Sequence, residues 1–286
     1  MVSVSEMDRI SCSVDKTRWG KDGIHNPSHE TKYPVVQDVI LSWSCQKIQT
    51  DKKRPMRLPL ELLTGQIIAQ LSIIPMVLYA EPWQWGITAV MYFGIMTFGL
   101  TMGYHRYFSH RVFTSPLWFE YVMLFFAHIM MIGPAIVWVA NHRQHHKFTD
   151  TDKDPHSPKH KGYFYAHFLQ VLTKIEFKYV RDMLKVPRYR IQVKFYWTII
   201  GAWALLLTLT DPSALVYAWL APAGFAKLIG SLVFSYSHRR GEAHSDWWVG
   251  MITFGEGFHK QHHENQRAKS FHKHDIGGMI INRIDR

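Results

Sequence analysis

The chain has 286 residues, a formal net charge of +11 and only two cysteines, and 47% of its residues are hydrophobic. Its mean hydropathy is nevertheless −0.12, which indicates strongly apolar blocks set among polar ones and argues against an ordinary soluble globule. Cys12 and Cys45 alone exclude a disulfide framework and a thiolate metal site. The basic residues flank the apolar blocks, which favours lipid headgroups or an acidic protein over a nucleic acid as partner.

Residues 1–57 are polar and end in a basic run, KKRPMR. The N-terminus lacks the apolar core of a signal peptide, so membrane insertion must come from internal segments. We therefore expect a polar N-terminal segment over 1–62 and a membrane domain over 63–286.

Four apolar segments predict transmembrane helices in two hairpins: 63–80, 85–104, 195–210 and 213–234. The second holds twenty residues without a charge, enough to cross a hydrocarbon core of about 30 Å. The connectors 81–84 and 211–212 carry no Lys or Arg, whereas the other polar segments carry nearly all of them. The positive-inside rule then places those polar segments on the cytoplasmic side.

A fifth segment, 117–140, is as long and apolar as a spanning helix. If it crossed, the residues before and after it would lie on opposite sides of the bilayer. Glu120, His128 and the Gly133-Pro134 break instead predict a bent or interfacial helix that does not cross.

Nine of the eighteen histidines fall in three short clusters and at the end of the last apolar segment. HRYFSH follows the second segment, HRQHH follows the fifth, HKQHH lies near the C-terminus, and one histidine follows the last span. Positions i, i+3 and i+4 of an α-helix share a face, so each HxxHH directs three imidazoles to one point. A spacing of five separates two α-helical side chains by about 140°, which suits ligands that straddle a metal or serve two metals.

Packed together without a metal, these imidazoles would lose solvation without compensation, so the clusters predict a metal site. Nine imidazoles exceed what one ion can use and predict two ions. Imidazole without cysteine is compatible with iron, copper, nickel or zinc, and the residues leave that choice open. The position at the ends of membrane helices indicates a substrate that lies in the bilayer.

The three histidine boxes resemble those of the membrane fatty acid desaturase family. The resemblance rests on GYHRYFSHR (103–111), WVANHRQHHKFTDTDKDPH (138–156) and GEGFHKQHH (255–263), and runs from about Thr101 to the C-terminus. It implies an all-α integral membrane protein with four transmembrane helices, a cytoplasmic helical cap and a di-iron centre held by histidines.

Transferred position by position, the resemblance implies nine iron ligands: His105, His110, His142, His145, His146, His238, His259, His262 and His263. Four polar neighbours, Asp150, Asp154, His156 and Glu256, are expected to hold the ligand tautomers by accepting the distal N–H. Trp138, one turn before the second box, is expected to line the acyl tunnel.

Two positions depart from the family pattern. The family commonly has Asn four residues before the ligand that corresponds to His238, and here that residue is Phe234, so another group such as Ser235 would have to take its place. VANHR also lacks the Arg-Asp pair that animal acyl-CoA desaturases place before the second box. The local pattern is closer to bacterial and cyanobacterial acyl-lipid enzymes, although a CoA-thioester substrate stays open.

The resemblance implies an oxidoreductase that uses two Fe²⁺ ions and O₂ to place a cis double bond in a long-chain acyl-CoA or acyl-lipid, with reduction of O₂ to water. The electrons would come from an external ferredoxin or cytochrome b5 type donor, which a basic cap would attract. A hydroxylase or ketolase on the same scaffold is the nearest alternative. A histidine-rich membrane metal transporter is a second one, although transporters place their ligands near the bilayer midplane.

Overall fold

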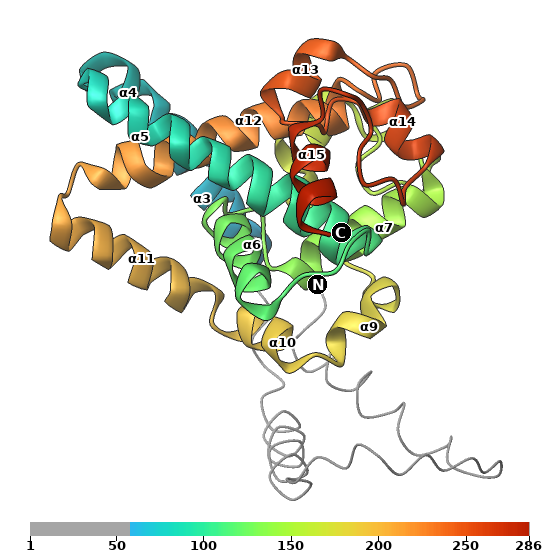
Figure 1. Ribbon diagram of the computed structural model, residues 1–286, viewed down its shortest axis with the longest axis horizontal. Helices are drawn as coiled ribbons and strands as arrows, with labels where there is room; N and C mark the ends of the chain where they lie inside the picture. The colour runs from blue at the N-terminus through green and yellow to red at the C-terminus, as the bar shows by residue number, and fades with distance from the viewer. Residues whose placement is uncertain (1–57, 286) are drawn as a thin grey trace, which may run out of the picture.

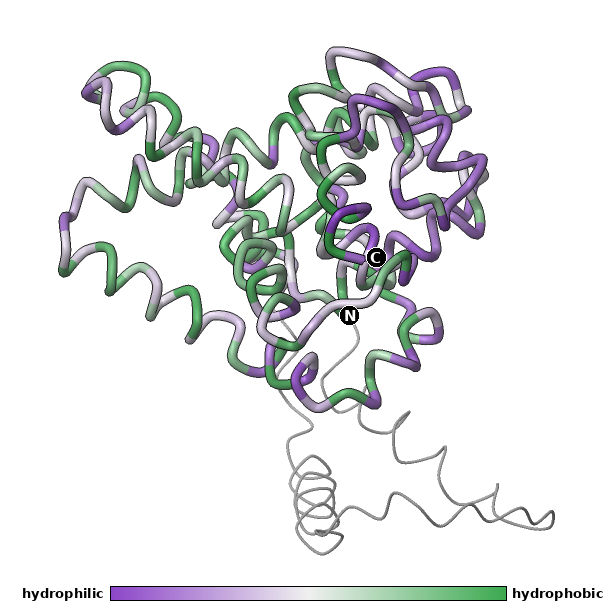
Figure 2. Tube along the Cα trace, in the orientation of Figure 1, coloured by the Kyte–Doolittle hydropathy of each residue, from purple (hydrophilic) through white to green (hydrophobic). Residues whose placement is uncertain are grey.

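The computed structural model of the protein describes residues 58–285, and the expected polar segment over 1–57 lies outside these residues. The described chain is helical throughout apart from one isolated bridge between Ser245 and Phe258. Long apolar helices project to one side of the molecule, and the shorter helices that carry the histidines gather on the other (Figure 1). Hydropathy follows the same division (Figure 2).

The first hairpin begins at Leu58. Its first arm consists of α3 (Leu58–Leu71) and α4 (Ile73–Tyr79). Its second arm consists of α5 (Pro82–Phe93), which continues without interruption into the π-helical segment η1 (Gly94–His110). Glu81 and Gln84 cap α5 reciprocally, each side chain bonding the backbone N–H of the other. The chain therefore turns sharply between the two arms.

The second hairpin is less regular. α10 (Pro187–Lys194) meets α11 (Tyr196–Thr210) at an angle of 67°, and α11 covers the third predicted span. The returning arm consists of the π-helical turn η5 (Val216–Leu220) and α12 (Ala221–Ser235).

Three helices, Pro59–Tyr79, Pro82–His110 and Val216–Ser235, are long and apolar enough to cross a membrane, and the bent pair α10–α11 gives a fourth. Large apolar side chains such as Leu78, Val90 and Leu209 are more than 60% exposed on these helices, as expected for surfaces that face lipid. The protein is thus an all-helical, multi-pass membrane protein.

The apolar segment 117–140 is broken into two helices, α6 (Leu117–Ile129) and α7 (Ala135–Phe148). The break falls at the Gly133-Pro134 pair, where Gly133 has a φ of 102° and Pro134 precedes the first residue of α7. The polar side chains of α6 bond within the protein: Glu120 accepts from Arg188 and Tyr107, and His128 bonds the Tyr196 carbonyl. That this segment stays on one side of the membrane remains a prediction.

Short elements complete the part that carries the histidines. They are α8 (Pro158–Lys161), η2 (Tyr165–Leu169), η3 (Gln170–Leu172), η4 (Phe177–Val180), α9 (Arg181–Leu184), α13 (Trp247–Ile252), α14 (His259–Glu264) and α15 (Ile276–Ile284). η2 and η3 pack against α12 and α3, so this segment closes one side of the space between the first and last spans.

α12 and α3 come into backbone contact at Gly224. A Cβ atom at this position would lie 2.2 Å from the Ala69 carbonyl oxygen. Only glycine allows this approach, so the contact between Gly224 and Ala69 fixes the separation of the first and last spans.

We expect Gly224→Ala to lower the melting temperature of the detergent-solubilised protein. The clashing atom belongs to a helix backbone and cannot swing aside, so the helices must separate, at a cost of about 1–3 kcal/mol. Gly201→Ala in α11 is the matched control, because a Cβ there meets nothing within 4 Å. The control should be neutral or slightly stabilising, since alanine favours the helix. Equal melting temperatures for the two variants would contradict the close approach.

Candidate metal centre

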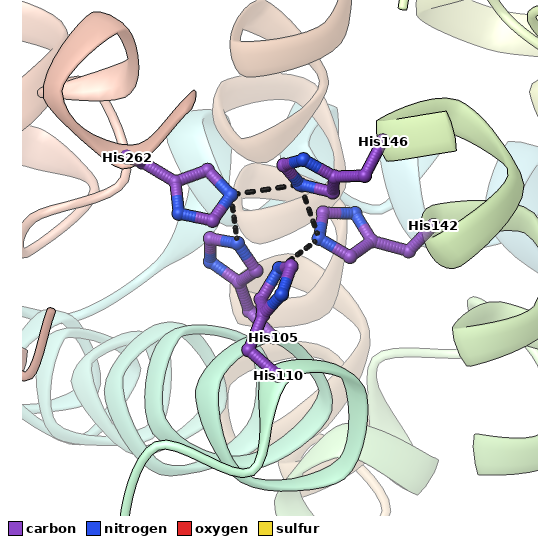
Figure 3. Close-up of side chains that lie close together, drawn as sticks. All are labelled: His105, His110, His142, His146 and His262. Atoms are coloured by element: carbon purple, nitrogen blue, oxygen red, sulfur yellow. Dashed lines mark hydrogen bonds between the residues drawn. The ribbon is translucent and has the colours of Figure 1, made fainter. Parts of the chain in front are cut away.

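The nine predicted histidines meet in two adjoining groups. His105, His110, His142, His146 and His262 form a five-histidine group (Figure 3), and His145, His238, His259 and His263 form a four-histidine group. Within each group the possible ligand atoms lie within 4.8 Å of one another. Six of the nine side chains are buried, and the other three are partly buried. Two groups, each able to hold a metal ion, agree with the predicted need for two ions.

The first box corrects one step of the sequence argument. An α-helical spacing of five was expected to separate His105 and His110, so that they would straddle a metal or serve two. Both belong to the same five-histidine group, which agrees with two ligands that straddle one metal, but they lie in the π-helical η1 and not in an α-helix. A π-helix bonds residue i to i+5, so residues five apart share one face. The non-standard helix is therefore what directs this pair to one point.

The two HxxHH boxes were expected to direct all their imidazoles to one point, and this was also wrong in detail. In α7, His142 and His146 join the five-histidine group while His145 joins the other. In α14 the roles are exchanged: His259 and His263 join the four-histidine group, and His262 joins the other. The i and i+4 side chains of each helix thus serve one group, and the i+3 side chain serves its neighbour.

The nitrogen atoms within each group converge at distances that suit a shared cation. In the five-histidine group, Nε2 of His142 lies 2.8 Å from that of His110 and 3.1 Å from that of His146. In the four-histidine group, Nε2 of His259 lies 2.9 Å from that of His238 and 3.1 Å from that of His263.

Hydrogen bonding among neutral imidazoles does not explain this geometry. Each neutral ring carries a single N–H, whereas Nε2 of His142 and Nε2 of His259 each face the Nε2 atoms of two other rings. Nitrogens at right angles around a metal, each about 2.1 Å from it, would be about 3 Å apart. The donor set therefore fits a metal ion in each group.

Three carboxylates orient the histidines from behind. Glu256 Oε2 lies 2.5 Å from His105 Nδ1, Asp154 Oδ2 lies 2.8 Å from His145 Nδ1, and Asp150 Oδ2 lies 2.7 Å from His238 Nδ1. Asp154 and Asp150 can accept the Nδ1 protons of His145 and His238, which leaves each Nε2 unprotonated and directed into its group. Glu256 contacts His105 Nδ1 closely, but the contact does not have the geometry of a hydrogen bond. Asp150, Asp154 and Glu256 therefore lie where the sequence placed them, behind the imidazoles.

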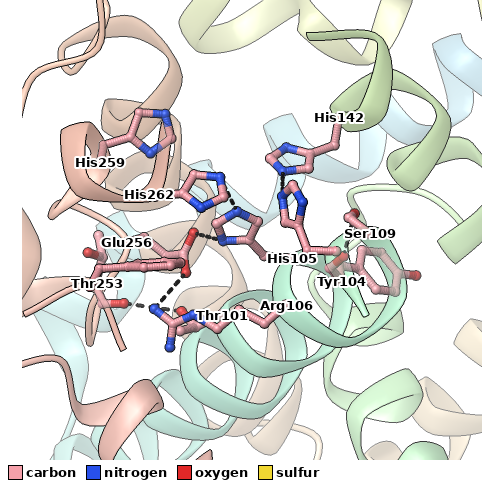
Figure 4. Close-up of polar contacts among 12 residues, drawn as sticks. Thr101, Tyr104, His105, Arg106, Ser109, His142, Thr253, Glu256, His259 and His262 are labelled. Atoms are coloured by element: carbon pink, nitrogen blue, oxygen red, sulfur yellow. Dashed lines mark hydrogen bonds and ion pairs between the residues drawn. The ribbon is translucent and has the colours of Figure 1, made fainter. Parts of the chain in front are cut away.

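A buried arginine extends this arrangement and was missed in the sequence (Figure 4). Arg106 is fully buried, donates two hydrogen bonds to Asp275, and lies 3.8 Å from Glu256 Oε1. It thus links the helix of the first box to Glu256, which precedes the third box, and to Asp275, which follows it and caps α15. Its place next to His105 in HRYFSH was the only available signal, and nothing in the sequence marked Asp275 as its partner.

His156, the fourth predicted neighbour, lies beside the four-histidine group without joining it. Its ring stacks on His145 at 4.6 Å, and its Nε2 is buried without a hydrogen-bond partner among the described residues. Phe234 packs edge-on against it at 4.7 Å, so an apolar ring occupies the position where the family commonly has Asn. Ser235, the suggested replacement, bonds the Ser231 carbonyl and His167 instead. Of His156 and Ser235, it is therefore His156 whose polar side chain lies beside Phe234, at the position where the family commonly has Asn.

A pocket opens next to the histidines between α3, α7, α12 and η3. Trp138, His142, His156 and Phe234 line one part of it, and the Trp138 ring stacks on His142 with a centroid distance of 4.8 Å. Leu100, Met130, Ile132 and Val137 supply an apolar lining. Trp138 therefore lies between the five-histidine group and an apolar space, as expected for a residue of an acyl tunnel.

Burial keeps several of the clustered histidines uncharged. Desolvation, and then the neighbouring imidazoles, lowers the pKa of His142, His146 and His262 well below 6.5. The same causes lower the pKa of His263 to about 3. Metals bind the neutral form of imidazole, so at neutral pH the site is held in the form that ligation requires.

Comparisons with known proteins agree with this geometry. The sequence model of the fatty acid desaturase family matches residues 81–275, more than half of the chain. The chain is 30% identical over 189 residues to delta-9 acyl-lipid desaturase 2 of Arabidopsis thaliana, covering 60% of this chain and 61% of the relative. It is 31% identical over 195 residues to sn-1 stearoyl-lipid 9-desaturase of Anabaena variabilis, covering 63% and 71%. It thus spans about six tenths to seven tenths of these relatives.

We expect Asp150→Asn to lower the metal affinity of the four-histidine group by about 10–100-fold, because the charge behind His238 is lost. Asparagine tolerates the left-handed backbone at this position, where φ is 57°. The metal content of the purified protein after a chelator wash measures the effect. Asp152→Asn, an exposed residue of the same loop, is the matched control. Equal metal retention by both variants would refute the role of Asp150.

The metal-free protein should lose stability as the pH falls below about 6.5. The unfolded chain binds protons on its histidines near that pH, whereas the folded chain binds them only at lower pH, so acid favours unfolding. Each such histidine contributes a slope of about 1.4 kcal/mol per pH unit. Thermal unfolding of chelator-treated protein at several pH values measures this slope. A melting temperature independent of pH between 7 and 5 would contradict the burial of neutral imidazoles.

Proposed function

The chain belongs to the fatty acid desaturase family, and from this premise we propose that it introduces a cis double bond into a long acyl chain. The reaction removes two hydrogens from neighbouring methylenes and, with two electrons and two protons from a donor, reduces one O₂ to two waters. The single observation that carries the proposal is the contact between the five-histidine group and the apolar pocket, made by Trp138 and His142.

Iron is the metal that we propose for both groups. Bound there, two iron ions would supply the oxidising power to break an unactivated C–H bond, which no acid or base of the protein can do. The buried imidazoles supply nitrogen ligands of the kind that iron accepts, and the described residues 58–285 include no cysteine. Asp150 and Asp154 would keep the ligand tautomers fixed while the charge of the centre changes.

The chain's own residues would position the substrate and exclude water. The apolar side chains of Leu100, Met130, Ile132 and Val137 suit the methylenes of an acyl chain. The Trp138 and Phe234 rings form the part of the pocket nearest the histidines. Because methylenes are chemically alike, the site of the double bond would be set by how far the chain enters this pocket. The contact of Phe234 with His156 makes these two side chains candidates for setting that depth.

We propose that the substrate is an acyl chain carried by a membrane lipid. The relatives from Arabidopsis and Anabaena are named acyl-lipid and stearoyl-lipid desaturases, which supports this class. VANHR, which lacks the Arg-Asp pair of the acyl-CoA enzymes, also favours this class over a CoA thioester.

The histidines would lie on the cytoplasmic side, where the positive-inside rule places 105–192 and 235–286. Lys159, Lys161 and Lys260 are exposed in these segments. Such a basic surface would favour an acidic electron donor of the ferredoxin or cytochrome b5 type.

Co-expression with a reductase and donor, followed by mass spectrometry of total lipids, tests the proposal. We expect acyl chains that are two mass units lighter and carry one new cis double bond. An added oxygen instead would overturn desaturation in favour of hydroxylation or ketone formation. Metal flux in proteoliposomes without O₂ uptake would favour a transporter.

His145→Ala should abolish the new double bonds and release metal from the four-histidine group, while the protein still inserts into the membrane. The side chain faces its group with Nε2 and is held by Asp154, so alanine removes a ligand without disturbing a span. Activity and metal content are measured in the same preparation. His274→Ala, an exposed residue outside both groups, should retain both properties. Full turnover by His145→Ala would refute the ligand role.

A further inference from the structure

The two histidine groups differ in the number of ligands that they offer. One group supplies five imidazole nitrogens to its metal, and the other supplies four. Non-haem iron sites keep positions open beyond their protein ligands. An octahedral ion would therefore have two open positions in the four-histidine group and one in the five-histidine group.

His156 brings an unpaired polar atom to the side of the centre that has fewer ligands. The residue is 3% exposed, and its Nε2 is buried without a hydrogen-bond partner among the described residues. The ring stacks on His145 with a centroid distance of 4.6 Å and an interplanar angle of 26°. Ligand atoms of His145, Asp154 and His156 lie within 4.8 Å of one another. A buried nitrogen without a partner is unfavourable, so we expect a ligand beside it.

The loop that carries His156 holds the residue in place. The His156 backbone N–H donates to Asp154 Oδ1 at 3.0 Å, and the other oxygen of the same carboxylate lies 2.8 Å from His145 Nδ1. Thr173, at the end of η3, donates to the Pro155 carbonyl at 3.1 Å. One carboxylate thus orients both a ligand of the four-histidine group and the imidazole stacked on that ligand.

His156 is set back from the point where the four ligand nitrogens converge, because it is not one of the residues whose ligand atoms all lie within 4.8 Å of one another in that group. A single water molecule can bridge such a gap: a metal–oxygen bond of about 2.1 Å and a hydrogen bond of about 2.8 Å together span nearly 5 Å. Phe234, which packs against His156, offers no polar atom, and Ser235 already bonds Ser231 and His167. The nitrogen of His156 is therefore the free polar atom of these three residues.

We propose that His156 is a tenth residue of the metal centre, and that its Nε2 holds a water molecule which completes the ligand set of the metal in the four-histidine group. A neutral imidazole can accept a hydrogen bond from such a water or donate one to it. The water would satisfy the buried nitrogen and fill a position that the four histidines leave open. His156 is thus a positioning residue. The inference rests on the metal site and not on the reaction proposed for it.

Cobalt(II) binding to the metal-free full chain in detergent tests the proposal without turnover. His156→Phe keeps an aromatic ring against His145 and removes the nitrogen. We expect it to weaken binding of one of the two cobalt ions by about tenfold, as the loss of an outer partner typically does, and to leave the other ion unaffected. His274→Phe, the same change at an exposed position outside both groups, is the matched control and should bind both ions as the wild type does.

The visible absorption of the bound cobalt reports the coordination of the weakened ion. Cobalt with fewer ligands absorbs more strongly, so loss of the water should increase the absorption. Adding Phe234→Asn to His156→Phe returns a polar group beside position 156, and we expect it to restore both the affinity and the spectrum. Loss of ring packing alone would not be repaired by an amide.

Unchanged cobalt affinity in His156→Phe, or a loss that Phe234→Asn leaves in place, would overturn the proposal in favour of a packing role. If His156→Phe fails to insert, His156→Gln and His156→Leu take its place. These two side chains are similar in size, and only glutamine can hold a water, so it should bind the second cobalt ion more tightly. Equal affinities for this pair would also remove the water site.

The two proposals fail separately. A lipid profile without new double bonds would overturn desaturation, while cobalt binding that depends on His156 would still establish the water site. Conversely, new double bonds together with cobalt binding indifferent to His156 would leave the desaturase proposal intact and remove the water site.

Discussion

Nine imidazoles can be buried side by side only while they are uncharged, and this constraint shapes the rest of the molecule. Desolvation lowers the pKa of His142, His145 and His259, so protonation of these side chains is suppressed and their nitrogen atoms are available to metal ions. The same desolvation is unfavourable unless something compensates for the lost water. Carboxylates behind three of the rings provide part of that compensation, and bound metal would provide the rest.

The exchange of ligands between the two HxxHH helices ties the groups together. α7 gives two histidines to the five-histidine group and one to the other, and α14 does the reverse. Neither helix can shift without disturbing both groups. Arg106 adds a further connection, because it joins the first box to Glu256 and Asp275 near the third. A redox centre that must keep its geometry while its charge changes would benefit from such coupling.

The pocket links this centre to the membrane part of the protein. It is enclosed by the first and last spans, whose separation is fixed where Gly224 touches Ala69, and by the η2–η3 segment that covers them. Lys227 and Gln66 lie one turn from that contact, so the feature that holds the spans together also places the polar groups of the pocket.

The sequence by itself determined the spans, the break at Gly133-Pro134 and the identity of the histidines that come together, because hydropathy, Gly-Pro pairs and ligand spacing are local properties. It also identified Asp150, Asp154 and Glu256. Only the tertiary structure decided how the histidines divide into two groups, since i, i+3 and i+4 share a helix face and the neighbouring segments determine which group each side chain joins.

The π-helical form of η1 likewise could not be read from HRYFSH, because a π-helix has no strong local pattern and is retained by its packing. The partners of Arg106 and Lys227, which are Asp275, His167 and Ser231, required the fold for the same reason. A buried charge is recognisable in a sequence, whereas the group that satisfies it is chosen by how distant segments pack.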